Sequence, residues 1–188
     1  MEALFISTFS VALAEVGDKT QLLALLLAAR FRKPWPIVVG ILLATLLNHG
    51  VAAHVGAWVS SLLSPELQRW LIAAAFIVMG LWILVPDAED DTAARYSYGA
   101  FLTTLIAFFL VEIGDKTQIA TVMLAANYQP ISMVIAGTTL GMLAANVPVV
   151  VAGHFSADRL PLRLIRGAAA VVFVALGVLV LMGGLEPA

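Results

Sequence analysis

The chain contains no cysteine and few charged residues. Only 12% of its 188 residues are Asp, Glu, Lys or Arg, and the formal net charge is −2. The absence of cysteine excludes disulfides, thiolate metal sites and thiol chemistry. The small net charge gives no indication of nucleic-acid binding. Because no nucleophile–base pair or phosphate-binding loop is recognisable, the sequence does not predict an enzyme.

Most of the chain is apolar. Hydrophobic residues make up 62% of it and the mean hydropathy is +1.01, whereas soluble domains contain about 45–50% apolar residues. Stretches of about 20 apolar residues recur, which is the length of a helix that crosses a bilayer. The sequence therefore predicts an all-α membrane protein, surrounded by lipid, with six transmembrane helices. We place them near residues 4–29, 36–61, 68–85, 99–126, 130–155 and 164–183.

The two halves of the chain are repeats related by a shift of 97 residues. Residues 15–21 (EVGDKTQ) recur as residues 112–118 (EIGDKTQ), and the same shift superposes Gly40 on Gly137. We expect a first three-helix repeat at 1–86, a cytoplasmic acidic linker at 87–98 and a second three-helix repeat at 99–188, all in one membrane domain. Because three spans is an odd number, the second repeat must be inverted. Many secondary transporters have this plan, with their sites at the repeat interface.

The basic residues predict the orientation in the membrane. Loops that follow the first, third and fifth spans all lie on one side, and they carry seven basic residues against one on the other side. The seven are Arg30, Arg32, Lys33, Arg95, Arg159, Arg163 and Arg166, and the one is Arg69. By the positive-inside rule, we place these three loops in the cytoplasm and both termini outside.

Four carboxylates lie inside the predicted spans: Glu15, Asp18, Glu112 and Asp115. A charged residue at the centre of a membrane helix costs about 2.5–3.5 kcal/mol on insertion scales, and such residues are functional by default. On a straight helix the Glu and the Asp of each motif share a face. If the inverted repeats meet at a two-fold axis, all four carboxylates converge. Such a group of oxygens is suited to a hard divalent cation.

Neutral side chains near the carboxylates are candidate secondary ligands. On a straight helix those inside the motifs point away from the carboxylate face, but a break at the motif glycine would turn them inward. The side chains of the second and fifth spans are either outer ligands or interhelical hydrogen-bond partners, and the sequence leaves both readings open. These six candidates are Thr20, Gln21, Thr117, Gln118, Asn48 and Asn146. At His49, a hydrogen bond to a neighbouring helix is favoured over a proton-accepting role.

Each motif also contains one lysine, Lys19 or Lys116. The favoured interpretation is charge compensation, in which Lys19 pairs with Glu15 and Lys116 pairs with Glu112, because buried charges persist when they are paired. A second interpretation is that a lysine occupies the carboxylates when the cation is absent.

The two motifs resemble the signature Glu-x-Gly-Asp-(Lys/Arg)-(Ser/Thr) of a family of cation exchangers, which includes Golgi, chloroplast-envelope and bacterial manganese/calcium transporters. The family is similar in plan to the lysine-exporter superfamily. Residues 15–20 and 112–117 match the signature without departure, and the resemblance covers the whole chain. It implies export of Mn²⁺ or Ca²⁺ from the cytosol in exchange for H⁺. The functional positions that it implies are Glu15, Asp18, Thr20, Glu112, Asp115 and Thr117.

We therefore expect a secondary antiporter with Mn²⁺ as the favoured substrate, Ca²⁺ as the other candidate, H⁺ as the coupling ion and no permanently bound cofactor. Two alternatives stay open: a divalent cation channel with an acidic filter, and a membrane scaffold that does not transport. The chain begins almost directly with its first span, which favours the plasma (inner) membrane of a prokaryote over an organellar membrane. The sequence leaves homo-oligomerisation open.

Overall fold

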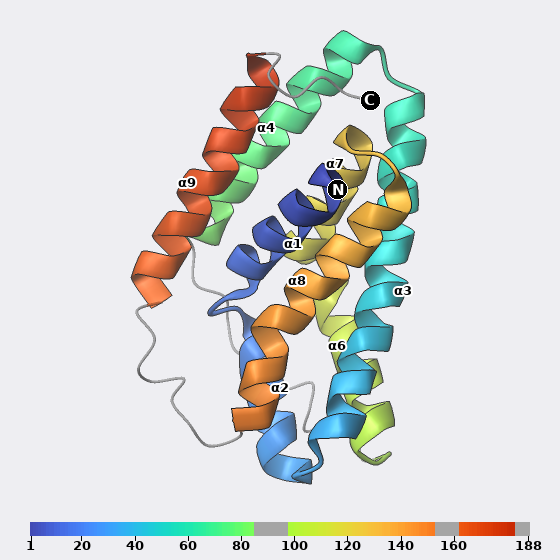
Figure 1. The fold of residues 1–188 in the computed structure, drawn as a ribbon, viewed down its shortest axis with the longest axis vertical. Helices are drawn as coiled ribbons and strands as arrows, with labels where there is room; N and C mark the ends of the chain where they lie inside the picture. The colour runs from blue at the N-terminus through green and yellow to red at the C-terminus, as the bar shows by residue number, and fades with distance from the viewer. Residues whose placement is uncertain (85–97, 153–161, 183–188) are drawn as a thin grey trace.

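The computed structural model describes residues 1–84, 98–152 and 162–182, and all regular elements in these ranges are α-helices (Figure 1). The prediction of an all-α protein is confirmed for this part of the chain. The predicted linker at 87–98 falls almost entirely outside the described residues, as do Arg95 and Arg159. The helices are α1 (Glu2–Glu15), α2 (Lys19–Phe31), α3 (Pro34–Ser61), α4 (Pro65–Ile83), α6 (Ala100–Glu112), α7 (Lys116–Asn127), α8 (Ile131–Ala152) and α9 (Leu162–Leu181).

The first and fourth predicted spans are each divided into two helices. The break falls inside the motif in both cases, between α1 and α2 and between α6 and α7. In each break the motif glycine has a positive φ, 79° at Gly17 and 75° at Gly114. A residue with a side chain rarely adopts this conformation, so glycine is what allows the chain to leave one helix and start the next. The remaining predicted spans correspond to α3, α4, α8 and α9.

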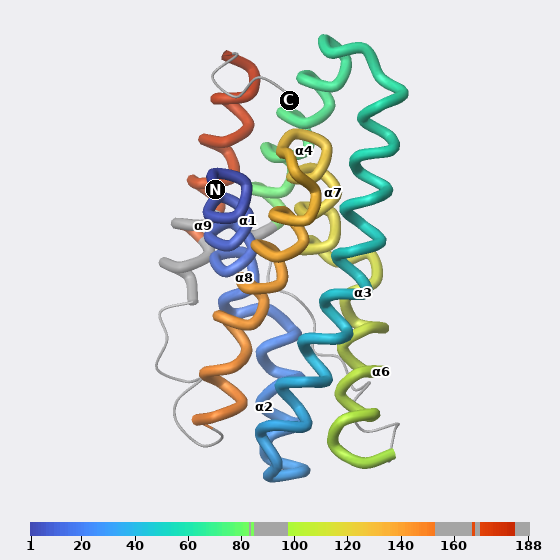
Figure 2. The backbone as a smooth tube through the Cα atoms, turned by 45° about the vertical axis from the view of Figure 1, so that its right-hand side comes forward, coloured from blue at the N-terminus to red at the C-terminus, as the bar shows by residue number. Residues whose placement is uncertain are grey.

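The helices of the two halves are interleaved. Helix α8 packs along α1 and α2 of the first half, and its repeat counterpart α3 packs along α6 and α7 of the second half. Helices α3 and α8 also contact each other, so α8 lies between α1 and α3 (Figure 2). Helices α4 and α9 pair with each other at one side of the bundle (Figure 1). Each broken helix is therefore covered mainly by a long helix of the other half.

Glycines on α3 and α8 make this close packing possible. A side chain at Gly40 would meet Thr104 of α6 at 2.8 Å, and one at Gly137 would meet Ser7 of α1 at 2.8 Å. These two contacts are equivalent under the shift of 97 residues. Small residues let helix backbones approach closely. The repeat that is visible in the sequence is thus matched by equivalent contacts in the structure.

Equivalent helices of the two halves run in opposite directions. In Figure 1, α1 and α2 descend while α6 and α7 ascend, and α3 ascends while α8 descends. Within the described ranges, two helices are long and apolar enough to cross a membrane by length and composition, α3 and α8. The insertion of six spans in a membrane stays a prediction.

Apolar side chains cover the outside of the bundle, while many polar ones are buried. Large hydrophobic residues are exposed on several helices, among them Phe5 and Phe9 on α1, Val51 on α3, Val78 on α4 and Val171 on α9. The buried polar residues include all four motif carboxylates. Large exposed apolar surfaces mark sites of contact with a membrane or a partner protein.

Candidate cation site

The first motif forms a short connection between two helices. Helix α1 ends at Glu15, Val16 is extended, Gly17 turns the chain, and Asp18 is the N-cap of α2. The Asp18 carboxylate accepts a hydrogen bond from the backbone N–H of Lys19 at 2.6 Å. Positively polarised N–H groups at a helix start favour a carboxylate there. The connection thus places Glu15 at the end of one helix and Asp18 at the start of the next.

The second motif has the same local structure. Helix α6 ends at Glu112, Ile113 is extended, Gly114 turns the chain, and Asp115 is the N-cap of α7. One Asp115 oxygen accepts hydrogen bonds from the backbone N–H of Thr117 at 3.5 Å and from its hydroxyl at 3.3 Å. On a straight helix, the Glu and the Asp of each motif would share one face. The helix breaks at the glycines, so this arrangement is not found.

The two motif glutamines hold these connections together. The side-chain oxygen of Gln21 accepts a hydrogen bond from the Gly17 N–H at 2.7 Å, and that of Gln118 accepts one from the Gly114 N–H, also at 2.7 Å. The Gln21 amide also donates to the carbonyl of Ala145 on α8 at 2.9 Å. Gln21 and Gln118 stay candidate ligands, but in this structure their side-chain oxygens accept hydrogen bonds from the backbone of the turns.

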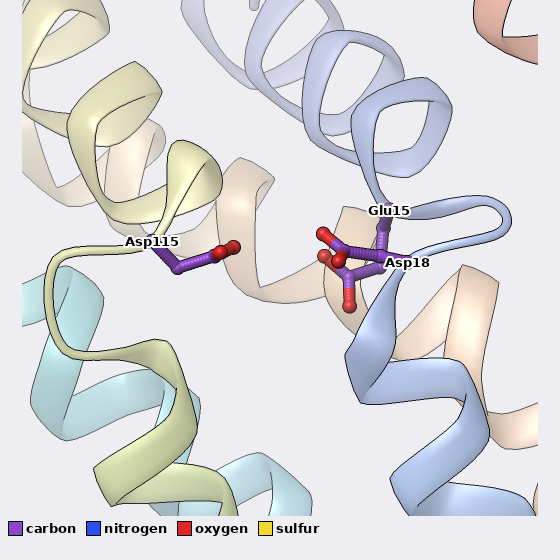
Figure 3. A group of neighbouring side chains, drawn as sticks. All are labelled: Glu15, Asp18 and Asp115. Atoms are coloured by element: carbon purple, nitrogen blue, oxygen red, sulfur yellow. The ribbon is translucent and has the colours of Figure 1, made fainter. Parts of the chain in front are cut away.

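Three carboxylates from the two motifs meet at the breaks. One oxygen each of Glu15, Asp18 and Asp115 lies within 4.8 Å of the others, and all three residues are buried. Figure 3 shows Asp115 pointing from the second motif towards Glu15 and Asp18 of the first. The interface between the two halves therefore contains a group of oxygens from both.

Glu112 is buried but is not a member of this group of three. One of its oxygens accepts a hydrogen bond from the Thr45 hydroxyl at 3.1 Å, and the other accepts one from the Asn48 amide, also at 3.1 Å. Asn48 also donates to the Phe109 carbonyl at 3.1 Å. The sequence did not single out Thr45. The structure therefore brings three of the four predicted carboxylates together and holds the fourth between two neutral donors of α3.

The environment of Glu15 differs from that of Glu112. Glu15 accepts a hydrogen bond from the Asn146 amide at 3.2 Å, and the same amide lies 3.1 Å from both the carbonyl oxygen and the sulfur of Met142. The second Glu15 oxygen and the Asn146 side-chain oxygen are buried and have no hydrogen-bond partner among the described residues. Buried acceptors without a donor are costly unless something else binds them.

The motif lysines form ion pairs between the two halves. The Lys19 ammonium lies 3.1 Å from an oxygen of Asp115, and the Lys116 ammonium lies 3.1 Å from an oxygen of Asp18. The prediction placed each lysine beside the glutamate of its own motif. The ion pairs that the structure shows instead join each lysine to the aspartate of the other motif. The helix breaks explain the difference, because the lysine and the glutamate of a motif no longer belong to one helix.

Two further residues that the sequence singles out, Thr20 and His49, also have buried polar atoms without a hydrogen-bond partner among the described residues. These atoms are the Thr20 hydroxyl and both ring nitrogens of His49. The predicted hydrogen bond of His49 to a neighbouring helix is therefore wrong in this state. Thr20 stays a candidate ligand, since it directly follows the first Asp–Lys pair.

Taken together, the site presents three carboxylates that meet between the two halves. A buried hydroxyl of Thr20 lies in the first motif, and a buried amide oxygen of Asn146 lies on the neighbouring helix α8. Hard divalent cations prefer oxygen ligands of this kind. The two lysines partly balance the negative charge. With all four motif carboxylates ionised and both lysines protonated, the two motifs would carry two negative charges, which is the charge that one divalent cation would neutralise.

Comparison with known proteins agrees with this chemistry. The family model described as "Divalent cation/proton antiporter GDT1" matches residues 3–91 and residues 100–188. A protein of Vibrio cholerae named "Putative manganese exporter" is 54% identical over 175 residues, which cover 93% of this chain and 88% of that protein.

More distant relatives come from plants. "GDT1-like protein 3" of Oryza sativa subsp. indica is 24% identical over 94% of this chain and 72% of its own length. "GDT1-like protein 5" of Arabidopsis thaliana is 25% identical over 88% of this chain and 89% of its own length. No solved structure matches the chain.

Proposed function

Because the chain belongs to the GDT1 family of divalent cation/proton antiporters, which are transporters and not enzymes, we propose that it exports Mn²⁺ from the cytosol in exchange for H⁺. The observation that carries the proposal is the group formed by Glu15, Asp18 and Asp115, which combines oxygens from both motifs at the interface of the halves. The name of the Vibrio cholerae relative supports Mn²⁺ as the substrate.

The charge of the site supports proton exchange. With all four carboxylates ionised and both lysines protonated, the buried motifs carry two net negative charges. Leaving them unbalanced in a poorly solvated site is costly. One divalent cation or two protons provide the same neutralisation. The proposed cycle therefore exchanges one Mn²⁺ for two H⁺, and the site is not left charged at either stage.

The arrangement of the two halves supports alternating access. Broken helices that meet at the interface of inverted repeats are the usual binding sites of secondary transporters. Here both breaks lie at that interface, and α8 and α3 each pack on the broken helices of the other half. We propose that the halves rearrange around the carboxylates, so that the ion is released on the side opposite to its entry.

The outer surface supports a membrane location. The exposed apolar residues of α1, α3, α4 and α9 suit contact with lipid tails, and α3 and α8 are long enough to cross a bilayer. We propose six membrane spans in the inner membrane of a prokaryote, with both termini outside. The basic residues between α2 and α3 would then lie in the cytoplasm.

Ion flux into proteoliposomes tests the proposal. The purified chain is reconstituted and Mn²⁺ uptake is measured with and without an imposed pH gradient. We expect uptake that depends on the gradient, that saturates with Mn²⁺ and that is lost in Glu15→Gln. The exposed Glu66 of α4 provides the matched control, since Glu66→Gln makes the same chemical change on the surface.

Each other outcome has a distinct meaning. Flux that is indifferent to the pH gradient would exclude proton coupling. Large single-channel currents would favour a channel with an acidic filter. No flux of Mn²⁺ from well-folded protein would favour a scaffold in which the ion pairs only join the helices.

A further inference from the structure

Helices α3 and α8 carry different chemistry at one equivalent position. The shift of 97 residues superposes Thr45 of α3 on Met142 of α8. Thr45 donates its hydroxyl to an oxygen of Glu112 at 3.1 Å. On the other side of the interface, the sulfur of Met142 lies 3.1 Å from the Asn146 amide nitrogen, which lies 3.2 Å from an oxygen of Glu15. A hydroxyl in one half is therefore replaced by a thioether in the other.

The thioether lies on the side of the interface where the carboxylates meet. Glu15, which is one bridging amide away from the Met142 sulfur, belongs to the group of three carboxylates, whereas Glu112 beside Thr45 does not. Met142 is fully buried. Met142 and Asn146 are four residues apart on α8, so both side chains lie on the same face of the helix.

The same place contains two acceptors that lack donors. One oxygen of Glu15 and the side-chain oxygen of Asn146 have no hydrogen-bond partner among the described residues, although both are buried. A bound cation is a ligand that could satisfy such acceptors. The Asn146 amide nitrogen contacts both the Glu15 carboxylate and the Met142 sulfur, so these three side chains are neighbours at the interface.

A sulfur ligand discriminates between cations that oxygen ligands treat alike. Ca²⁺, Mg²⁺ and Mn²⁺ all prefer oxygen ligands, but Mn²⁺ is a transition-metal ion and tolerates one softer donor better than Ca²⁺ and Mg²⁺ do. Thioether sulfur is soft and polarisable. One such donor among oxygens would therefore retain affinity for Mn²⁺ and lower the affinity for Ca²⁺, for which the same position would better hold a hydroxyl or water.

We propose that Met142 is a specificity-determining residue, whose thioether faces the transported ion and selects a transition-metal ion over Ca²⁺. This inference rests on the proposed function, because it concerns the choice of ion at the same site. If Met142 only fills space in the interface between helices, replacing it should not change which ion is transported.

The test compares ion selectivity in proteoliposomes. Mn²⁺ and Ca²⁺ uptake are measured separately for the wild type, Met142→Leu and Met142→Thr, and the ratio of kcat/KM for the two ions is compared. Met142→Leu conserves volume and removes the sulfur, and such swaps are tolerated in packed cores. Met142→Thr introduces the hydroxyl found at the equivalent position of α3.

We expect the preference for Mn²⁺ over Ca²⁺ to fall about tenfold in both variants, which is the lower end of the effects seen when the surroundings of a metal site are changed. Met79→Leu is the matched control, because Met79 is a buried methionine of α4, the helix that pairs with α9. It should leave the ratio unchanged. Inhibition of Mn²⁺ uptake by the softer ion Cd²⁺ should weaken in Met142→Leu and not in Met79→Leu.

Failure of this inference differs from failure of the proposed function. If the wild type takes up Mn²⁺ and both Met142 variants keep the wild-type ratio of Mn²⁺ to Ca²⁺ transport, the selectivity role is overturned and the antiporter stands. If the wild type takes up neither ion, the proposed function fails first. If a variant is poorly folded, direct Cd²⁺ and Mn²⁺ titration of the other variant in detergent decides the question, since unchanged affinities for both ions contradict the role of the sulfur.

Discussion

The ammonium of Lys116 lies 3.1 Å from a carboxylate oxygen of Asp18, although the two residues belong to different copies of the motif. The reciprocal pair joins Lys19 to Asp115 at the same distance. The two pairs are not equally buried, because the Lys116 side chain is 3% exposed and that of Lys19 is 22% exposed. Each half of the molecule therefore supplies the counter-charge for the other, and one of the two pairs is nearer to solvent.

Removing the more buried lysine should destabilise the fold more. We expect Lys116→Met to cost about 3–5 kcal/mol, since it removes one partner of a buried ion pair and leaves the Asp18 carboxylate without that ammonium. Lys19→Met should cost less, because solvent partly screens the charge that remains on Asp115. Thermal unfolding in detergent measures both. The double variant Lys116→Met/Asp18→Asn removes both charges and should recover much of the loss, whereas equal losses in the single and double variants would contradict pairing across the halves.

The two glutamates should contribute unequally to ion binding. Glu15 has one oxygen without a donor, whereas both oxygens of Glu112 accept hydrogen bonds from α3. We expect Glu15→Gln to lower Mn²⁺ affinity at least about tenfold, and Glu112→Gln to lower it less. Calorimetric titration of both proteins in detergent provides the comparison. A larger loss in Glu112→Gln would mean that Glu112 leaves Thr45 and joins the ion when it binds.

The positive φ of the motif glycine should be required for stability. A side chain at Gly114 would meet no other atom within 4 Å, so its cost arises from the backbone conformation alone. We expect Gly114→Ala to destabilise the protein by about 1–2 kcal/mol, the approximate cost of left-handed backbone for an L-residue. Gly50 of α3 is also open to a side chain but has helical backbone. Gly50→Ala should therefore stabilise the protein by about 0.5–1 kcal/mol, and the same sign for both variants would contradict the argument.

The contact between α3 and α7 should not accept an added methyl group at Gly56. A side chain there would overlap the backbone carbonyl of Val122, which cannot move as a flexible side chain can. We expect Gly56→Ala to cost about 1–3 kcal/mol through overpacking and to lower the yield of folded protein. Gly167→Ala on α9, where the new methyl group meets nothing within 4 Å, is the control. An unchanged Tm in Gly56→Ala would show that α3 and α7 can separate at this point.

The sequence predicted the helical class from its long apolar stretches, and the repeat is visible in it as the recurrence of the motif. The importance of the motif carboxylates stays a prediction, which rests on the cost of charges in apolar segments. The sequence allowed a helix break at Gly17 and Gly114 but did not decide between a broken and a straight helix. A glycine within an apolar run permits a positive φ but does not require it. Once the breaks are known, the N-cap roles of Asp18 and Asp115 follow from ordinary helix capping.

The partners across the interface could not be predicted from sequence spacing. Spacing along a helix identifies neighbours on that helix, so it paired Lys19 with Glu15, whereas the structure pairs it with Asp115. The separate environment of Glu112 depends on the rotation of α3, which places Thr45 and Asn48 against it. The sequence does contain one signal of this asymmetry, because the shift of 97 residues pairs Thr45 with Met142 at a position where the halves differ chemically.

The interleaving of the halves has a consequence for the origin of the molecule. Since α8 covers α1 and α2 while α3 covers α6 and α7, neither half alone contains the cover for its own broken helix. An ancestor of half the length would have needed a second copy of itself, inserted the opposite way up, to shield the same surfaces. Duplication and fusion would then have turned a dual-orientation homodimer into one chain. That event would have freed the two copies to diverge, as the hydroxyl of Thr45 and the thioether of Met142 have done.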